Sequence, residues 1–151
     1  ARGRLERCAV FLDEDMVYHP DWDYLGIRTP TTEKDYYEAL HRFFEKFERA
    51  TGLKIIIAAH PRFRHDLRPH LFAGREVVYG QTAELVRDAT LIFAHASTSI
   101  SFAVLWRKPM VFLPTNALNQ SHYGPLIKLR SQLFRAPLYN CSLSTQQNID
   151  L

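Results

Sequence analysis

Two short polar sites in this sequence carry side chains suited to binding a phosphate group. His60-Pro61 closes one apolar run, and Ser97-Thr98-Ser99 follows another. A histidine ring can donate a hydrogen bond to a phosphate oxygen or a leaving group, and Pro61 turns the chain away from a preceding strand. Hydroxyls and the N–H groups that begin a helix also favour an anion. Both sites have a plainer interpretation as well, because Ser and Thr are common helix caps and a lone histidine at a strand end is often structural.

Charged residues lie close to these sites in the sequence. Arg62 and Arg64 could hold a phosphate through paired N–H donors, although arginines in such loops are commonly only solvated. Asp13 and Asp15 directly follow an apolar run, and a carboxylate there could act as a catalytic base. The alternative for the acidic residues is a plain, exposed strand end.

Apolar runs of strand length place both sites at strand ends. Residues 54–59 and 90–94 are nearly continuous apolar runs, as in strands buried on both faces of a parallel sheet. In open parallel sheets the ligand crevice lies outside the carboxyl ends of the strands. We therefore expect His60 and Ser97–Ser99 to lie where binding or chemistry takes place. Three further runs are also predicted strands: 8–12, 76–79 and 109–113.

The strongest helix prediction lies between Thr32 and Gly52. Thr32 with Asp35 resembles a capping box, and Gly52 is a natural C-terminal stop. The apolar residues between them recur at helical spacing, so we expect this stripe to pack against the sheet rather than line a ligand site. The stripe consists of Tyr36, Tyr37, Leu40, Phe43, Phe44 and Phe47.

Weaker patterns complete the chain. Thr82 is expected to cap a short helix through Arg87, and Ser97 or Thr98 to cap a helix over residues 100–105. Another helix is expected near Leu126 to Leu133. Segments rich in polar residues, Gly and Pro are predicted loops: 19–31 and 114–125.

The alternation of strands and helices predicts an α/β fold, a Rossmann-like open parallel sheet of about five strands with helices on both faces. With 151 residues, of which 46% are hydrophobic, the chain fits a single domain, 1–151. It begins at Ala1 rather than Met and trails off in polar residues, so we expect a domain excised from a two-domain protein.

Composition limits the classes of protein. Residues 1–88 carry 14 Lys and Arg against 15 Asp and Glu, whereas residues 89–149 carry five basic residues and no acid. This cationic late half of the chain, residues 89–149, favours an anionic ligand or an acidic membrane surface. The sequence has no stripe of basic residues with stacking aromatic residues between them, so it does not indicate nucleic-acid binding. Cys8 and Cys141 are expected to be reduced thiols. Neither a membrane-spanning run nor a signal peptide is recognised, so we expect a cytoplasmic protein.

Taken together, His60-Pro61, Ser97-Thr98 and Lys108-Pro109 resemble the nucleotide-sugar-binding, C-terminal half of GT-B glycosyltransferases. The sequence is most similar to bacterial surface-polysaccharide enzymes: sialyltransferases with HP and Ser/Thr motifs, Kdo-type capsule transferases and polyglycerolphosphate polymerases. The resemblance spans roughly residues 9–116. It implies that His60 contacts the donor's nucleotide phosphate and assists its departure, and that Ser97 and Thr98 hold that phosphate.

The resemblance also implies partners and a missing part. The donor would be a nucleotide-activated sugar, perhaps CMP-linked, and the acceptor a glycan or a lipid-linked molecule in capsule or lipopolysaccharide synthesis. An N-terminal acceptor domain would precede Ala1. Bacterial sialyltransferases carry their acidic motif, with a glycine, in that other half, whereas Asp13-Glu14-Asp15 lacks the glycine. No metal or other cofactor is expected, and the cationic late half would suit a peripheral contact at the inner face of a membrane.

Two alternatives belong to other classes. An apolar strand followed by Asp13-x-Asp15 resembles the first motif of haloacid-dehalogenase-type phosphatases, in which the first carboxylate attacks phosphorus and the second is a general acid. That family closes its Mg²⁺ site with later acids, and none occurs in residues 89–149. The same Asp-x-Asp could be a metal-binding motif of single-domain glycosyltransferases. The second alternative is a nucleotide-binding module without catalysis.

Overall fold

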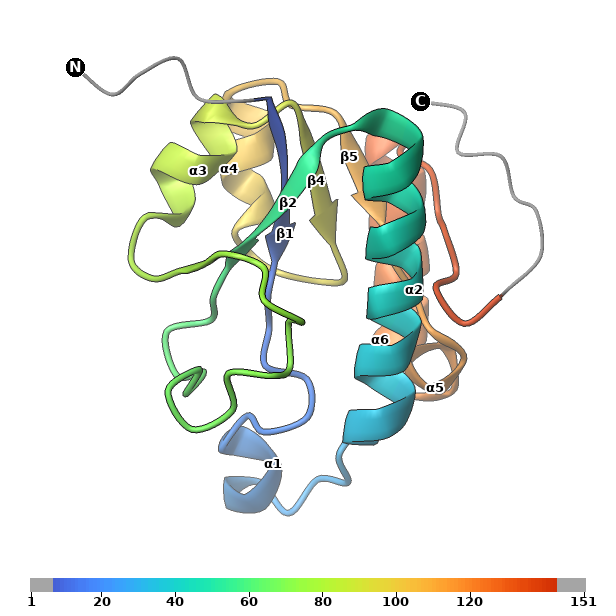
Figure 1. Ribbon diagram of the computed structural model, residues 1–151. Helices are drawn as coiled ribbons and strands as arrows, with labels where there is room; N and C mark the ends of the chain where they lie inside the picture. The colour runs from blue at the N-terminus through green and yellow to red at the C-terminus, as the bar shows by residue number, and fades with distance from the viewer. Residues whose placement is uncertain (1–6, 144–151) are drawn as a thin grey trace.

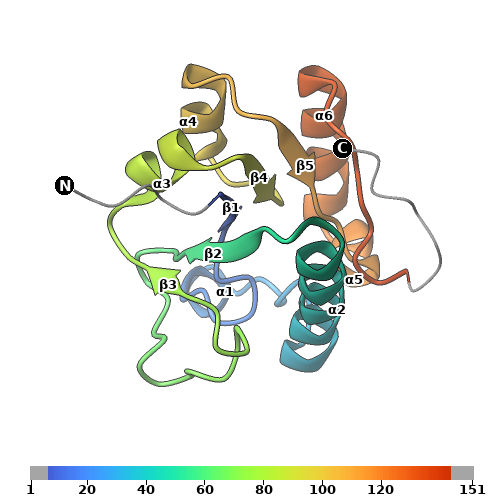
Figure 2. The ribbon, with the colours of Figure 1, turned by 45° about the horizontal axis from the view of Figure 1, so that its top comes forward.

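A computed structural model describes residues 7–143, and five strands in it form one parallel sheet. The order of the strands is β3-β2-β1-β4-β5, with helices on both faces (Figures 1 and 2). The predicted fold class, a Rossmann-like open sheet of five strands, is confirmed. The strands are β1 (Cys8–Leu12), β2 (Lys54–Ala58), β3 (Val77–Val78), β4 (Leu91–Ala94) and β5 (Met110–Phe112). The helices are α1 (Asp21–Tyr24), α2 (Glu33–Thr51), α3 (Thr82–Asp88), α4 (Ile100–Leu105), α5 (Asn116–Gln120) and α6 (Tyr123–Phe134).

The central strand explains why the apolar runs carry so few polar residues. All five residues of β1 are buried. Val10 pairs with Ile56 of β2 on one side and with Ile92 of β4 on the other. Since helices cover both faces, side chains that point either way from the strand must be apolar.

Helix α2 confirms the strongest helix prediction. The Thr32 hydroxyl accepts from the backbone N–H of Asp35, and Gly52 ends the helix with a φ of 72°. A positive φ is strained for residues with a Cβ, which is why glycine suits this position. All six residues of the stripe are buried, and Phe43 meets Phe93 of β4 edge to face at 5.1 Å. The stripe is core packing, as predicted.

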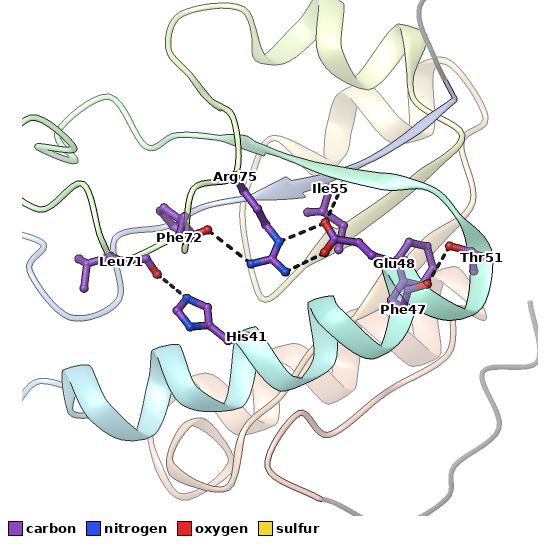
Figure 3. A network of polar contacts seen from close by, with 8 residues as sticks. All are labelled: His41, Phe47, Glu48, Thr51, Ile55, Leu71, Phe72 and Arg75. Carbon is purple, nitrogen blue, oxygen red and sulfur yellow. Dashed lines mark hydrogen bonds and ion pairs between the residues drawn. The ribbon is translucent and has the colours of Figure 1, made fainter.

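A polar network fastens α2 to the segment that leads into β3 (Figure 3). The Glu48 carboxylate accepts from Arg75 through Nε at 3.1 Å and through Nη2 at 2.7 Å. It also accepts from the backbone N–H of Ile55 at the start of β2. His41 contacts the carbonyl oxygen of Leu71 at 2.6 Å. These contacts hold the long β2–β3 connection against the helix.

The prediction of one polar loop over 114–125 is wrong, because α5 and the start of α6 occupy most of it. The Thr115 hydroxyl caps α5 by accepting from Leu118 N, and Leu118 is its one buried residue. A helix with a single core residue has too little apolar periodicity to be found from sequence. The predicted loop over 19–31 likewise contains the single turn α1, whose Trp22 is buried.

Two predicted helix caps are also wrong. Helix α3 starts after Gln81 rather than after a capping Thr82, and no side chain caps it. Helix α4 starts after Ser99, again without a side-chain cap. The hydroxyl of Ser97 accepts instead from the backbone N–H of Ser99, within the turn before the helix. Ser and Thr bond to nearby backbone in turns as readily as in caps, so sequence does not separate the two cases.

Candidate functional site

The strand order reverses between β1 and β4, since the chain runs outward through β2 and β3 and then returns to add β4 and β5 on the other side. All strands run the same way, and their carboxyl ends face the connecting loops and α1 (Figure 1). His60 follows β2, the Asp13–Asp15 triplet follows β1, and Ser97 follows β4. The predicted site residues therefore come from three adjacent strand ends, at the place where ligands bind in open α/β sheets.

Asp13 ties the first two strand ends together. Its Oδ2 accepts from the backbone N–H of His60 at 3.2 Å, and its Oδ1 accepts from that of Asp15 at 3.1 Å. Burial raises the pKa of Asp13 to about 7, and the N–H donors oppose that rise. Because both oxygens already accept from backbone, Asp13 positions the segment that carries His60.

Asp15 is the least accessible acid of the triplet. Only 1% of the residue is exposed, its φ is 50°, and its Oδ1 has no hydrogen-bond partner among the described residues. Burial raises the pKa of Asp15 to about 6, against the lowering effect of His19 and Arg68. Asp13 is also buried, at 4% exposure. The interpretation of this stretch as an exposed acidic strand end is therefore wrong.

Glu14, which the sequence analysis did not select, reaches the other side of the site. Its Oε2 accepts from the backbone N–H of Ala96 at 2.8 Å, and this bond spans the position where the strand order reverses. Burial raises the pKa of Glu14 to about 7. Alternation along an extended chain places neighbouring side chains on opposite faces of a sheet, and it does not determine which adjacent strand end each one contacts. The sequence therefore held no clear signal for this contact of Glu14.

His60 is half-buried and held in one tautomer. Its Nδ1 accepts from the backbone N–H of Arg62, so the neutral ring carries its proton on Nε2. Burial lowers the pKa of His60, and the neighbouring His19 and Arg62 lower it further. Its ring lies edge-on to that of His19, with centroids 4.7 Å apart. A neutral imidazole with a fixed Nε2–H is a hydrogen-bond donor at neutral pH.

The two arginines predicted to bind phosphate are paired with acids. Arg62 donates to Asp21 at 3.0 Å, and both side chains are about half exposed. Arg64 donates to both oxygens of Asp66 in an exposed pair. Among the described residues neither guanidinium contacts the segment 97–99.

A different arginine contacts that segment. Arg130 of α6 donates through Nη1 to the carbonyl oxygen of Ala96 and, at 2.7 Å, to that of Ser97. Its Nε and Nη2 have no hydrogen-bond partner within residues 7–143. No sequence pattern marks Arg130, because it is brought to the site by the packing of a helix far along the chain.

His95 is a structural histidine beside the site. It is fully buried, lies 2.8 Å from the Tyr36 hydroxyl and contacts the carbonyl oxygen of Leu113. Burial lowers the pKa of His95 to about 4, so the ring is neutral and joins α2 to the segment after β5.

A hollow of about 700 Å³ lies to one side of these strand ends. It is bordered by residues 27–32, Asp35, Ala117 and residues 120–122, and none of His60, Ser97 or the Asp13–Asp15 triplet lines it. Its His122 contacts the ring of Trp22, and Trp22 contacts that of His19. Aromatic rings thus connect this hollow to His60.

In the part of the chain that the structure describes, no three His, Cys, Asp or Glu side chains are grouped so that they could hold a metal ion. Between residues 7 and 143 no helix has the length and apolar character needed to span a membrane. The two cysteines are buried free thiols.

Comparison with protein-family models gives no match, and neither does comparison with curated proteins.

Proposed function

We propose that this chain is the donor-binding domain of a nucleotide-sugar-dependent glycosyltransferase of the GT-B type, acting in bacterial surface-polysaccharide or lipopolysaccharide synthesis. One observation carries the proposal. His60 and Ser97-Thr98 follow the two strands that flank β1, so residues 37 positions apart in the sequence lie at the same edge of the sheet. The motifs that resemble the family are thus arranged as a shared phosphate site requires.

The chemistry assigned to each residue follows from its surroundings. His60 donates its Nε2–H to the departing nucleotide phosphate, which stabilises the charge that develops there. Ser97 and Thr98 supply hydroxyl and N–H donors. Helix α4 has only six residues, so its dipole contributes little and the side chains must do most of the binding. Asp13 and Asp15 are poor candidates for the catalytic base, because both are buried.

The phosphatase alternative is less favoured by this geometry. Its nucleophile would be Asp13, whose two oxygens already accept from the backbone N–H groups of Asp15 and His60. A carboxylate engaged in this way is not presented to a phosphorus atom. A nucleotide-binding module without catalysis shares the donor site, and it differs only in lacking turnover.

The donor site can be tested on the chain alone by thermal shift and calorimetry with CMP, UDP, GDP and CDP, each with and without Mg²⁺. We expect one nucleotide to bind without Mg²⁺. His60→Ala and Ser97→Ala should each weaken that binding by about tenfold or more, the value of a hydrogen bond to a charged group. His70→Ala, which alters an exposed histidine, is the matched control.

Three results would contradict the proposal. The first is that no nucleotide binds, and the second is that binding requires both Mg²⁺ and Asp13. The third is that neither His60→Ala nor Ser97→Ala changes the affinity. Selective binding would also name the donor class. The acceptor, a glycan or a lipid-linked molecule, would then be sought with the N-terminal acceptor domain joined to this one. Turnover in that joined protein separates a transferase from a binding module.

A further inference from the structure

The segment Ala96-Ser97 is held from two sides by charged side chains. The Glu14 carboxylate accepts from the N–H of Ala96, and the backbone N–H of Ser97 also lowers the pKa of Glu14. Arg130 donates to the carbonyl oxygens of both residues. Glu14 at the end of β1 and Arg130 of α6 therefore both form hydrogen bonds with the same stretch of backbone.

The contacts of Arg130 determine the direction in which the N–H groups of Ser97 and Thr98 point. In a planar trans peptide the C=O and the N–H point in opposite directions. When Arg130 draws the carbonyls of Ala96 and Ser97 to its side, the N–H groups of Ser97 and Thr98 turn to the other side. Glu14 accepts hydrogen bonds on that N–H side. A phosphate held by Ser97 and Thr98 needs the same side.

We propose that Glu14 and Arg130 are positioning residues of the phosphate site, Arg130 by fixing the carbonyls and Glu14 by fixing the N–H of Ala96, and that a charged Glu14 competes with the phosphate. This inference rests on the proposed function, because it concerns the same crevice. Its consequence is that phosphate binding takes up a proton, since a neutral Glu14 still holds the loop but no longer repels the ligand.

The groups around Glu14 support such a linkage. Asp13 faces it from the β1 end and raises its pKa, whereas Arg130 of α6 lowers it. Tyr123 at the start of α6 and Tyr36 of α2 also face it, and the pKa of each is raised mainly by burial and further by Glu14. The lowered pKa of His60 keeps that ring neutral above about pH 6.5. Asp13 and Glu14 thus both have raised pKa values of about 7, and Glu14 is the one of the two that accepts from the backbone N–H of Ala96.

Substitutions separate the two effects of Glu14. Glu14→Gln keeps an oxygen that accepts from Ala96 but carries no charge. At pH 8 it should bind a dianion on the order of tenfold more tightly than the unaltered protein, because one repulsion is removed, and at pH 6 the two should be nearly equal. Glu14→Ala loses the acceptor as well, so it should bind more weakly than Glu14→Gln at both pH values. Asp23→Asn, which removes an exposed acid of α1, is the control for net charge.

Arg130 is tested in the same assay. Arg130→Gln should weaken binding by about tenfold or more at both pH values, since it releases both carbonyls. Arg130→Lys keeps a charged donor and should recover part of that loss. A purely structural role would instead lower the binding of cytidine and of CMP alike, whereas loss of a positioned phosphate site affects CMP alone.

The experiment is isothermal titration calorimetry with CMP and with sulfate, whose charge is constant between pH 6 and 8, in two buffers that differ in ionisation enthalpy. We expect proton uptake on binding of either anion at about pH 7, and its loss in Glu14→Gln. Nucleotide binding that depends on His60 and Ser97 without proton uptake, and with no effect of Glu14→Gln, would overturn this inference and leave the proposed function standing. Proton-linked sulfate binding without any nucleotide binding would uphold the inference and contradict the proposed function. Failure of all anions to bind would overturn both.

Discussion

The buried carboxyls at the end of β1 make the stability of this fold depend on pH in a way that Glu14→Gln should reveal. Burial raises the pKa of Glu14 to about 7 in the folded state, from a reference value of 4.5. Between these values the folded protein binds more protons than the unfolded chain, so the free energy of unfolding falls as pH rises toward 7. Above the folded pKa Glu14 is ionised in both states, so the full cost of burying its charge is present. The free energy of unfolding then no longer changes with pH on account of Glu14. Glutamine has no charge to lose, and its side-chain oxygen still accepts from Ala96.

The magnitude follows from the pKa. For one group of pKa about 7, the change in free energy of unfolding between pH 6 and 8.5 is on the order of 1 kcal/mol. Between pH 6 and 8.5 the stability of Glu14→Gln relative to the unaltered protein should therefore increase by that amount. For a chain of this size the increase corresponds to about 2–4 °C in Tm. His95, whose pKa is lowered to about 4, acts in the opposite direction at lower pH, and it is present in both proteins. The difference between the two proteins isolates Glu14.

Urea unfolding followed by circular dichroism at pH 6, 7 and 8.5 measures the effect. Glu38→Gln, on an exposed position of α2, serves as the matched control and should run parallel to the unaltered protein. Parallel curves for Glu14→Gln as well would refute the reasoning, because they would mean that Glu14 ionises alike in the folded and unfolded states. Such a result would also remove the basis for proton uptake on phosphate binding.

Three further substitutions test the packing around the site, each by urea unfolding. Phe93→Ala removes a fully buried ring that meets the aromatic stripe of α2, and it should cost about 3–5 kcal/mol; a loss below about 1 kcal/mol would contradict the packing. Gly124→Ala should cost about 1–3 kcal/mol, since a Cβ there would lie 2.4 Å from the Asn119 carbonyl oxygen, and an unchanged stability would mean that α5 and α6 are less closely packed. Arg75→Gln leaves a partly buried carboxylate without its partner and should cost about 1.5–3 kcal/mol. Arg64→Gln breaks only an exposed pair and should cost clearly less, so equal losses would refute the distinction.

The sequence was sufficient to predict the elements that carry strong apolar periodicity. The strand runs at 54–59 and 90–94 and the helix between Thr32 and Gly52 lie where they were expected, because burial on two faces or on one helical face leaves a repeating pattern. β3 is only two residues long, and α5 has one core residue. Elements of that kind are stabilised by tertiary contacts, which leave no period in the sequence.

The places of His60 and Ser97 in the fold could be predicted from the sequence, but the charged contacts around them could not. His60 and Ser97 were found because they follow recognisable strands. Arg62 seemed a suitable cation from its place in the chain, yet the structure pairs it with Asp21, and it is Arg130 that contacts the backbone after β4. Which charge meets which partner depends on the packing of α1 and α6. Neighbours along the chain do not determine that packing.

The location of the site is supported by an argument that does not depend on the resemblance of its motifs. Three consecutive carboxyls, Asp13, Glu14 and Asp15, all have raised pKa values because they are buried. Burying each one opposes folding at neutral pH, and Asp15 adds a positive φ and an oxygen without a partner among the described residues. A chain shaped by stability alone would end β1 with apolar or well-solvated residues. Perturbed acids of this kind are concentrated at functional sites, and these three lie at the strand ends where His60 and Ser97 also gather. The cost in stability thus supports this edge of the sheet as the functional site, independently of the phosphate ligand that we propose for it.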